Sequence, residues 1–279
     1  MRNAAIDLVA AKELGIVVTG AGKKHSTGNA EGIKKKRRGP DSTTQHTVAL
    51  ILGIARNLAQ DSHNLSSPGD NVWQTSLATS LSGKTFATLG LGRLGGSVAK
   101  IMYESFGMDV ICWSSSLTQD AADQKATELG LQPTDEDGEK VFKVVSKEEL
   151  FRQADVLSVH YVLSERSKHI VGKQELSWLK ETAFLVNTSR GPLVDEDALL
   201  DLLEKGGIAG AAVDVFEIEP LEKESKWRSN GWGRNGRSKV LLTPHMGYVE
   251  GEGLGEWYED QVEILGRWIR GEELRNVLS

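Results

Sequence analysis

One stretch of the sequence, KTFATLGLGRLGGSVAK at 84–100, constrains the fold more than any other. A β-like run enters it and an amphipathic helical pattern over 97–105 leaves it. Between them, Gly90, Gly92 and Gly95 have the spacing G-x-G-x-x-G. The first glycine allows a tight turn, the second lets backbone approach a pyrophosphate, and the third lets the helix lie close to the strand. A flexible turn is the alternative, but the strand–loop–helix context favours a dinucleotide-binding loop.

Short β-like runs alternate with helical patterns along the rest of the chain. The expected strands are 84–89, 109–113, 155–160, 183–189, 210–216 and 240–243. The expected helices between them are 117–129, 147–153, 173–179 and 195–204, and the helices 47–59 and 255–270 flank the unit. This order requires crossover connections and predicts a parallel sheet covered on both faces. We therefore expect an α/β protein with a doubly wound parallel sheet of the Rossmann type.

Other segments do not fit this alternation. Residues 1–40 hold one helix-then-strand pattern, AAIDLVAAKELGIVV, and are too short for an independent core. The run KKKRR at 34–38 is interpreted as a solvated loop, with a nuclear-targeting or phosphate-binding patch as the alternative. The glycine-rich segment WRSNGWGRNGR at 227–237 predicts an exposed loop with little internal packing.

Composition narrows the class of protein. Hydrophobic residues make up 39% and charged residues 26%, as in soluble globular proteins, and the net charge of −6 does not favour nucleic acid or an anionic membrane as a partner. No apolar run approaches the roughly 20 residues of a membrane span, and the start lacks the apolar segment of a secretory signal. The single cysteine, Cys112, excludes an internal disulfide and a multi-cysteine metal site. We expect a soluble cytoplasmic protein without a bound metal.

Polar side chains follow three of the predicted strands. LVNTSRGPLVDEDAL carries Arg190, AAVDVFEIEPL carries Asp214 and Glu219, and LLTPHMGY carries His245. The carboxyl ends of parallel strands line the ligand crevice of such a sheet. We therefore expect these side chains to converge near the bound dinucleotide.

The combination suits the oxidation of a 2-hydroxy acid. A histidine transfers protons near neutral pH, a neighbouring carboxylate orients the ring and favours its protonated form, and an arginine pairs with a carboxylate or polarises a carbonyl. Singly, each has a structural alternative: Arg190 as a loop cap, Glu219 as a solvated residue, His245 as a turn histidine. Their joint placement favours catalysis. His160 is a weaker candidate, either on the cofactor side or structural, and the other histidines, His25, His46, His63 and His169, have no comparable context.

The cofactor subtype is open at this stage. An acidic residue roughly 20 positions after the glycine loop would accept the ribose hydroxyls of NAD, but Ser114 and two further serines follow Trp113 instead. No carboxylate is present there to repel a 2′-phosphate, and no lysine or arginine adjoins the serines to bind one. The cofactor is therefore NAD or NADP, with NADP or dual use favoured.

These segments together resemble the D-isomer-specific 2-hydroxy-acid dehydrogenase family over about residues 2–273. The matching stretches are RNAAIDLVAAKELGIVV, STTQHTVALILGIAR, LSGKTFATLGLGRLGG, NTSRGPLVDEDALLDLL, AGAAVDVFEIEPL and LLTPHMGY. The resemblance implies hydride transfer between NAD(P) and a small D-2-hydroxy acid or 2-keto acid, and a homodimer formed through the nucleotide domain with helices such as 47–59.

The resemblance also implies roles for individual residues. The family's catalytic arginine falls on Arg190, its acid–base histidine on His245 and the glutamate paired with that histidine on Glu219. Its contact to the nicotinamide amide falls on Asp214. The predicted cofactor-binding set is Gly90, Gly92, Arg93, Leu94, Gly95, Ser114, His160, Thr188, Asp214 and Gly247.

Two departures from the family pattern are local, and one concerns length. Val162 replaces a frequent proline in HYVLSERS, and Ser114 replaces the usual acidic residue. Family members also have a flavodoxin-like substrate domain of several strands before the segment that matches RNAAIDL. We expect a truncated, discontinuous substrate domain, with 1–40 as its remnant, 41–247 as the dinucleotide-binding domain and 248–279 as a C-terminal helix returning to it.

Three interpretations of function therefore stand beside one another. The first is an active dehydrogenase. The second is a non-catalytic dinucleotide-binding interaction protein, like the transcriptional corepressors that share this fold. The third is an inactive truncated homologue.

Overall fold

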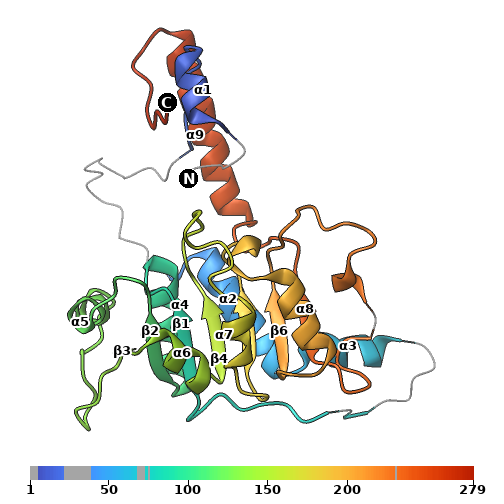
Figure 1. Cartoon of the computed structure of the whole chain (residues 1–279). Helices are drawn as coiled ribbons and strands as arrows, with labels where there is room; N and C mark the ends of the chain where they lie inside the picture. Colours follow the sequence, from blue (N-terminus) through green and yellow to red (C-terminus); the bar gives the residue numbers. More distant parts are fainter. Residues whose placement is uncertain (1–5, 22–38, 68–72, 75, 230) are drawn as a thin grey trace. The chain divides into compact units, whose positions relative to one another are not determined.

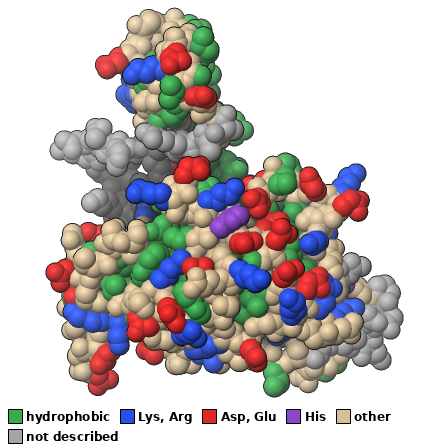
Figure 2. All heavy atoms as spheres, viewed as in Figure 1, with side chains coloured by type: hydrophobic (Ala, Val, Ile, Leu, Met, Phe, Trp, Pro, Cys, Tyr) green, Lys and Arg blue, Asp and Glu red, His purple; other side chains and the backbone are tan. Residues whose placement is uncertain are grey.

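The computed structural model describes residues 6–21, 39–67, 73–74, 76–229 and 231–279. The chain divides into two compact units, of which the larger is Pro40–Gly247 and the smaller combines Met1–Gly39 with Tyr248–Ser279 (Figure 1). The basic run at 34–38 lies outside the described residues. On the face of the larger unit seen in Figure 2, acidic and basic side chains are interspersed.

The larger unit is built on one parallel sheet of seven strands in the order β3-β2-β1-β4-β5-β6-β7. The strands are β1 Thr85–Leu89, β2 Asp109–Trp113, β3 Lys143–Val144, β4 Val156–Val159, β5 Phe184–Asn187, β6 Gly210–Val213 and β7 Lys239–Leu242. The chain moves outward from β1 to β3 and then returns to place β4 beside β1. The prediction of a doubly wound Rossmann-type sheet is confirmed, and the reversal between β1 and β4 marks where such sheets bind ligands.

Helices cover both faces of this sheet (Figure 1). They are α2 Ser42–Ala55, α3 Leu58–Ser66, α4 Arg93–Phe106, α5 Gln119–Glu128, α6 Lys147–Gln153, α7 Lys173–Ser177 and α8 Glu196–Glu204. The side chains of successive strand residues point to opposite faces of the sheet, and each face packs into its own apolar layer. In β5, Leu185 joins the layer under α6, α7 and α8, whereas Phe184 and Val186 join the layer under α2, α4 and α5. All three are buried, which explains the near-continuous apolar strands.

Two helices or strands of the larger unit differ from the sequence-based prediction. The helix expected over 47–59 is interrupted at Asn57, whose φ of 58° is left-handed and separates α2 from α3. The Asn57 amide donates to the Ser76 hydroxyl at 2.9 Å, so a local polar contact stabilises the break. The two-residue strand β3 was not predicted because it is too short to show a period-two pattern.

The prediction of an exposed, loosely packed loop over 227–237 is wrong. Trp227 and Trp232 are 2% and 8% exposed and belong to the apolar layer of α8. The Trp227 ring meets Phe216 edge-on at 6.0 Å, and the Trp232 indole N–H donates to the Trp227 carbonyl at 3.0 Å. The glycines of this segment suggest an exposed loop, but its two tryptophan rings are buried in the core. Burying an aromatic ring stabilises the fold by more than the entropic cost of ordering the loop.

The smaller unit contains helices α1 Leu8–Glu13 and α9 Gly251–Ile269. The strand expected after α1 is reduced, in the described part of the chain, to a single bridge between Thr19 and Val277. Several apolar side chains of α9 face solvent, including Val262 at 68% and Trp268 at 66% exposed. Among the described residues, no helix combines the length and the apolar character that a membrane crossing demands.

Candidate active site

The glycine loop follows β1 and lies against the end of β4. Gly90 has a φ of +102°, and a side-chain carbon at this position would lie 2.7 Å from the His160 carbonyl oxygen. A side-chain carbon on Gly95 would lie 2.0 Å from the Gly90 carbonyl oxygen. Both positions therefore require glycine, the first for its conformation and its contact, the second for its contact alone.

The loop fits the pyrophosphate of a dinucleotide. A side-chain carbon on Gly92 would meet nothing within 4 Å, so the backbone is open at the point where helix α4 begins. The first turn of this 14-residue helix carries N–H groups and a partial positive charge suited to an anion. Leu94 is half-buried, and the exposed Arg93 guanidinium pairs with Asp41 at 2.5 Å.

The segment after β2 carries no carboxylate. Ser114 is half-buried, and the neighbouring Ser115 is fixed by Tyr161, whose hydroxyl donates to the Ser115 hydroxyl at 2.9 Å and accepts its backbone N–H at 3.1 Å. Tyr161 also stacks on Trp113, with ring centroids 6.1 Å apart. This arrangement offers hydroxyl and backbone groups to a ribose, and it has no acidic group to reject a 2′-phosphate.

His160, between the glycine loop and Tyr161, is neutral at physiological pH. Burial lowers the pKa of His160 to about 4. Its ring Nε2 lies 2.8 Å from the Ser158 hydroxyl. The His160 carbonyl packs against Gly90 and its ring contacts Ser158. His160 therefore supports the glycine loop structurally.

His245 and Glu219 form a close ion-pair geometry at the carboxyl end of the sheet. The His245 Nδ1 lies 2.6 Å from Glu219 Oε2, and Glu219 Oε1 accepts the Phe216 backbone N–H at 2.9 Å. The two side chains are 31% and 33% exposed, so a substrate can approach them. The second bond holds the carboxylate in place, and the carboxylate in turn orients the imidazole ring.

Asp214 lies beneath this pair and is 1% exposed. Its Oδ1 accepts the Thr243 hydroxyl at 2.5 Å and the Met246 backbone N–H at 2.8 Å, and its Oδ2 accepts the Gly247 N–H at 3.1 Å. A side-chain carbon on Gly247 would lie 3.3 Å from Thr43 Cγ2, a tight contact, and 3.4 Å from Asp214 Oδ2, an ordinary one. Asp214 therefore fixes the turn that carries His245.

Arg190 and Thr188 follow β5, two strands from β7 in the sheet order. The exposed Arg190 donates from Nη1 to its neighbour's carbonyl, Ser189 O, at 2.6 Å. Thr188 is buried, and its hydroxyl lies 2.8 Å from that of Thr47 on α2. The structure thus brings Glu219 and His245 together. Arg190 lies at the same carboxyl end of the sheet, but its guanidinium is hydrogen-bonded to the carbonyl of the preceding residue.

Sequence reasoning missed one residue of this cluster, His46. Its Nε2 lies 3.1 Å from both Asp214 Oδ1 and the Thr243 hydroxyl, although His46 is 168 positions from Asp214. The sequence carries no signal for this contact, because it depends on how α2 lies over β5, β6 and β7.

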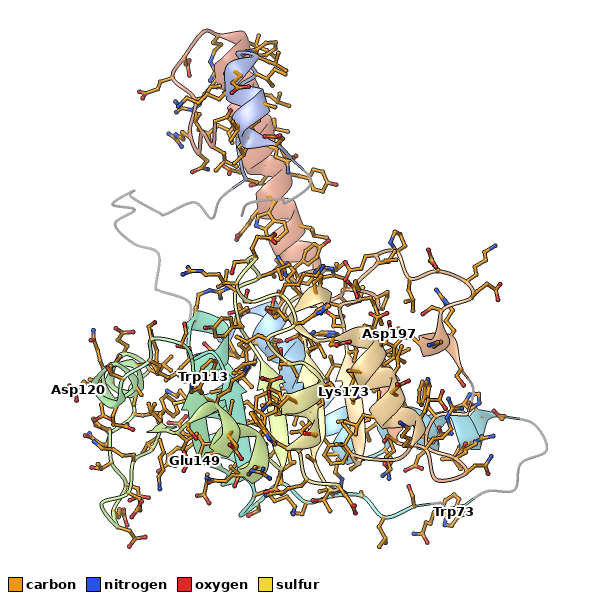
Figure 3. The ribbon with its side chains drawn as sticks, viewed as in Figure 1. Trp73, Trp113, Asp120, Glu149, Lys173 and Asp197 are labelled. Carbon is orange, nitrogen blue, oxygen red and sulfur yellow. The ribbon has the colours of Figure 1, made fainter. Side chains whose placement is uncertain are left out.

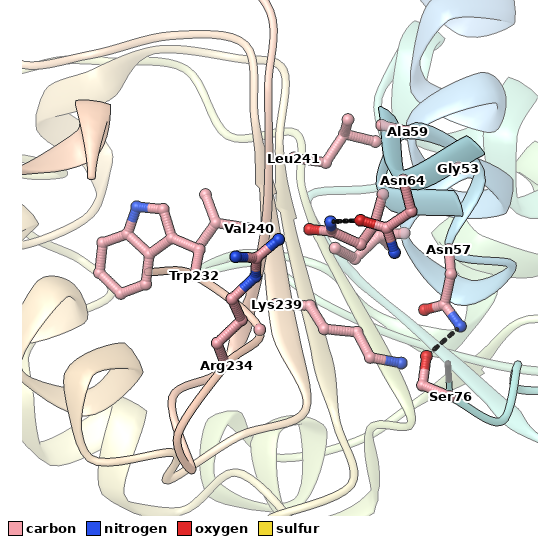
Figure 4. Close-up of a pocket in the computed structure, with 13 residues that line it drawn as sticks. Gly53, Asn57, Ala59, Asn64, Ser76, Trp232, Arg234, Lys239, Val240 and Leu241 are labelled. Atoms are coloured by element: carbon pink, nitrogen blue, oxygen red, sulfur yellow. Dashed lines mark hydrogen bonds between the residues drawn. The ribbon is translucent and has the colours of Figure 1, made fainter. Parts of the chain in front are cut away.

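A cavity of about 420 Å³ lies elsewhere on the larger unit and is lined by residues of α2, α3 and β7 (Figure 4). Its lining includes Asn57, Trp232, Arg234 and Lys239, and none of the predicted site residues. Within the described ranges, no three His, Cys, Asp or Glu side chains gather in a way that could hold a metal ion.

Residues 48–247 match the family model for the D-isomer specific 2-hydroxyacid dehydrogenase, NAD binding domain. The chain belongs to this family. Its larger unit is accordingly a nicotinamide-dinucleotide-binding domain for NAD or NADP, and the glycine loop and the helix N-terminus described above fit that cofactor.

Relatives in this 2-hydroxyacid dehydrogenase family share about a third of its residues. The chain is 35% identical to a glyoxylate reductase of Aeropyrum pernix over 86% of its length and 62% of the relative's. It is 30% identical to a D-3-phosphoglycerate dehydrogenase of Methanocaldococcus jannaschii over 98% of its length and 45% of the relative's. A solved phosphoglycerate oxidoreductase from Vibrio cholerae superposes with a TM-score of 0.76 at 28% identity, covering 97% of this chain and 75% of that one.

Proposed function

We propose that the protein transfers a hydride between NAD(P) and a small D-2-hydroxy acid or 2-keto acid. The observation that carries this proposal is the 2.6 Å contact between His245 Nδ1 and Glu219 Oε2, at the carboxyl end of strands that belong to a dinucleotide-binding domain. The carboxyl ends of the strands are where sheets of this kind bind their ligands. The names of the relatives support the same reaction class.

His245 is the proton-transferring group in this proposal. When bound, the nicotinamide supplies or accepts the hydride at C2 of the substrate. In the oxidising direction the His245 ring takes the hydroxyl proton through Nε2 while Nδ1–H remains bonded to Glu219, and in the reducing direction it returns that proton. The Glu219 carboxylate stabilises the imidazolium that results, and the hydrogen bond from the Phe216 N–H holds this carboxylate in its orientation.

Arg190 binds the substrate in this proposal. Its guanidinium is exposed, and among the described residues its hydrogen bond goes to a neutral acceptor, the Ser189 carbonyl. A carboxylate ligand would offer a bidentate, charged partner in place of that single bond, so rotation toward the substrate is favourable. Gly191, whose Cα lies against the Phe216 backbone, anchors the Arg190 loop to the segment that bears Glu219.

The remaining parts of the assembly are proposed from the family. The smaller unit is part of a discontinuous substrate domain, and the protein acts in the cytoplasm as a homodimer formed through its nucleotide domain. Exposed apolar side chains of α3 support a subunit contact, with Leu58 at 58% and Leu65 at 64% exposed. The absence of a carboxylate after β2 supports use of NADP as well as NAD.

The experiment is a turnover assay combined with a binding measurement. The purified chain is incubated with NADH or NADPH and with glyoxylate or hydroxypyruvate, while reduced-cofactor absorbance and cofactor affinity are followed. We expect turnover that falls by about 10²–10⁴-fold in His245→Ala and is unchanged in His63→Ala, an exposed histidine on α3. Tight cofactor binding without turnover of any 2-keto acid would reject the enzyme and favour the non-catalytic interaction protein. Absence of both binding and cooperative unfolding would favour the inactive homologue.

A further inference from the structure

Asp214 is a buried carboxylate that four donors surround. Three of them, the Thr243 hydroxyl and the Met246 and Gly247 backbone N–H groups, come from the turn that presents His245. The fourth direction is occupied by His46 Nε2, at 3.1 Å from Oδ1. A polar side chain that is 1% exposed costs free energy unless such donors replace its hydration.

The hydrogen bonds around Thr243 fix the tautomer of His46. The Thr243 hydroxyl has one hydrogen, and it donates that hydrogen to Asp214 Oδ1. Toward His46 Nε2, also at 3.1 Å, the same hydroxyl oxygen can only accept. Both neighbours of Nε2 are therefore acceptors, and Nε2 must carry a hydrogen.

The turn held by Asp214 needs external support. His245 has a φ of 55°, a left-handed conformation that is unfavourable for a residue with a side chain. Its backbone N–H donates to the Asp214 carbonyl at 2.8 Å, so main chain and side chain of Asp214 both contact this turn. His46 approaches the same carboxylate from α2, an element that contacts β5, β6 and β7. It thereby links the turn to the body of the domain.

We propose that His46 is a positioning residue for the proton-transferring His245, acting by donating its Nε2–H to Asp214 and so fixing the Thr243–Gly247 turn. The effect of His46 on catalysis rests on the proposed function, whereas its effect on the structure of the turn does not. Loss of the donor would leave a buried carboxylate short of one charge-assisted hydrogen bond and loosen the bonds from Met246 and Gly247.

The test compares two substitutions that differ in one hydrogen bond. His46→Gln keeps an N–H donor near the position of Nε2, whereas His46→Met has similar bulk and no donor. Amide hydrogen exchange of the 243–248 peptide, measured by mass spectrometry, is the main readout, with His63→Met as the matched control. We expect exchange about ten- to one-hundred-fold faster in His46→Met, near wild-type exchange in His46→Gln, and no change in the control. In the active enzyme, kcat should fall in His46→Met and recover in His46→Gln.

Two results would overturn the inference. Equal exchange in wild type and His46→Met shows that the bond does not hold the turn, and equal disturbance in both His46 variants shows that only packing matters. A long-range ¹H–¹⁵N spectrum of the unsubstituted protein gives the tautomer directly, so the idea stays testable even when a variant fails to fold. A hydrogen on Nδ1 alone would contradict it. Because neither measurement requires turnover, failure of the dehydrogenase proposal is distinguishable from failure of this one.

Discussion

Glu219 holds His245 by a single 2.6 Å contact while its other carboxylate oxygen is held by the Phe216 backbone N–H. Glu219→Gln keeps one oxygen for Phe216 but turns an amide –NH₂ toward His245 Nδ1. The ring must then accept at Nδ1 and carry its hydrogen on Nε2, the wrong tautomer for a base facing the substrate. We expect kcat to fall by about 10²-fold with little change in dinucleotide affinity. Steady-state kinetics and a binding titration check this, and Glu217→Gln, an exposed neighbour, should behave as wild type.

Gly90 is a glycine of the loop that is required both for its conformation and for its close contact. In Gly90→Ala, the new carbon meets the His160 carbonyl oxygen at 2.7 Å, and the φ of +102° is unfavourable for alanine. We expect a loss of about 2–4 kcal/mol in unfolding free energy together with loss of dinucleotide binding. Gly83→Ala is the control, since it has a φ of +69° and open space around it. It should lose only about 1 kcal/mol, and equal losses in both variants would show that the His160 contact is unimportant.

His160 gives stability a pH dependence of defined sign. Its pKa falls from an ordinary value of 6.5 to about 4 on burial, so between these values the unfolded chain binds a proton that the folded chain does not. Stability therefore rises with pH through this window and is lost as the pH falls from 6.5 toward 4. We expect the unfolding free energy to drop by about 2 kcal/mol more in wild type than in His160→Gln between pH 7 and pH 5. Urea titrations at the two pH values measure it.

The carboxylate of Asp155 does not confound that measurement. Asp155, held by the Thr85 N–H and Lys180, has a pKa below its ordinary 3.8, so its contribution is lost only at lower pH. A wild-type protein with the same pH 7 to pH 5 difference as His160→Gln would contradict the burial of a neutral His160.

Trp227 anchors the glycine-rich segment that follows β6. Trp227→Ala removes a ring that is 2% exposed and contacts Phe216, and we expect a loss of about 3–5 kcal/mol in unfolding free energy. Trp73→Ala is the matched control, because this ring is 76% exposed in the segment after α3 (Figure 3). It should change stability by less than about 0.5 kcal/mol. Chemical denaturation of the two variants decides whether the segment is part of the core.

The sheet was predictable because its signals are local. Helix α6 was expected over 147–153 and runs from Lys147 to Gln153, since Ser146 and Glu149 form a capping box that fixes where it begins. Apolar runs bounded by turns likewise located the six longer strands to within a few residues. The pairing of Glu219 with His245 followed from the resemblance and from the rule that strand ends converge.

The failures concern contacts that no local pattern encodes. His46 meets Asp214 only after α2 folds over the sheet, and a lone histidine in a helix gives no sign of that. Trp227 and Trp232 looked exposed because glycine and arginine surround them, but Arg237 itself covers Trp232, with its guanidinium 4.3 Å from the ring centroid. Asn57 ends α2 through a left-handed conformation that asparagine tolerates but that helix periodicity does not reveal.

Strand β7 is one of the two edge strands of the described sheet, with β6 as its one neighbour, and it leads into the turn that bears His245. Glu219, in contrast, follows the interior strand β6. A terminal strand opens more readily than an interior one. Each local opening of β7 would separate the His245 imidazole from the Glu219 carboxylate, while the nucleotide site between β1 and β4 keeps its structure. On warming, we therefore expect turnover to be lost at a lower temperature than cofactor binding. The reason is that turnover depends on an edge strand, whereas cofactor binding depends on interior strands of higher local stability.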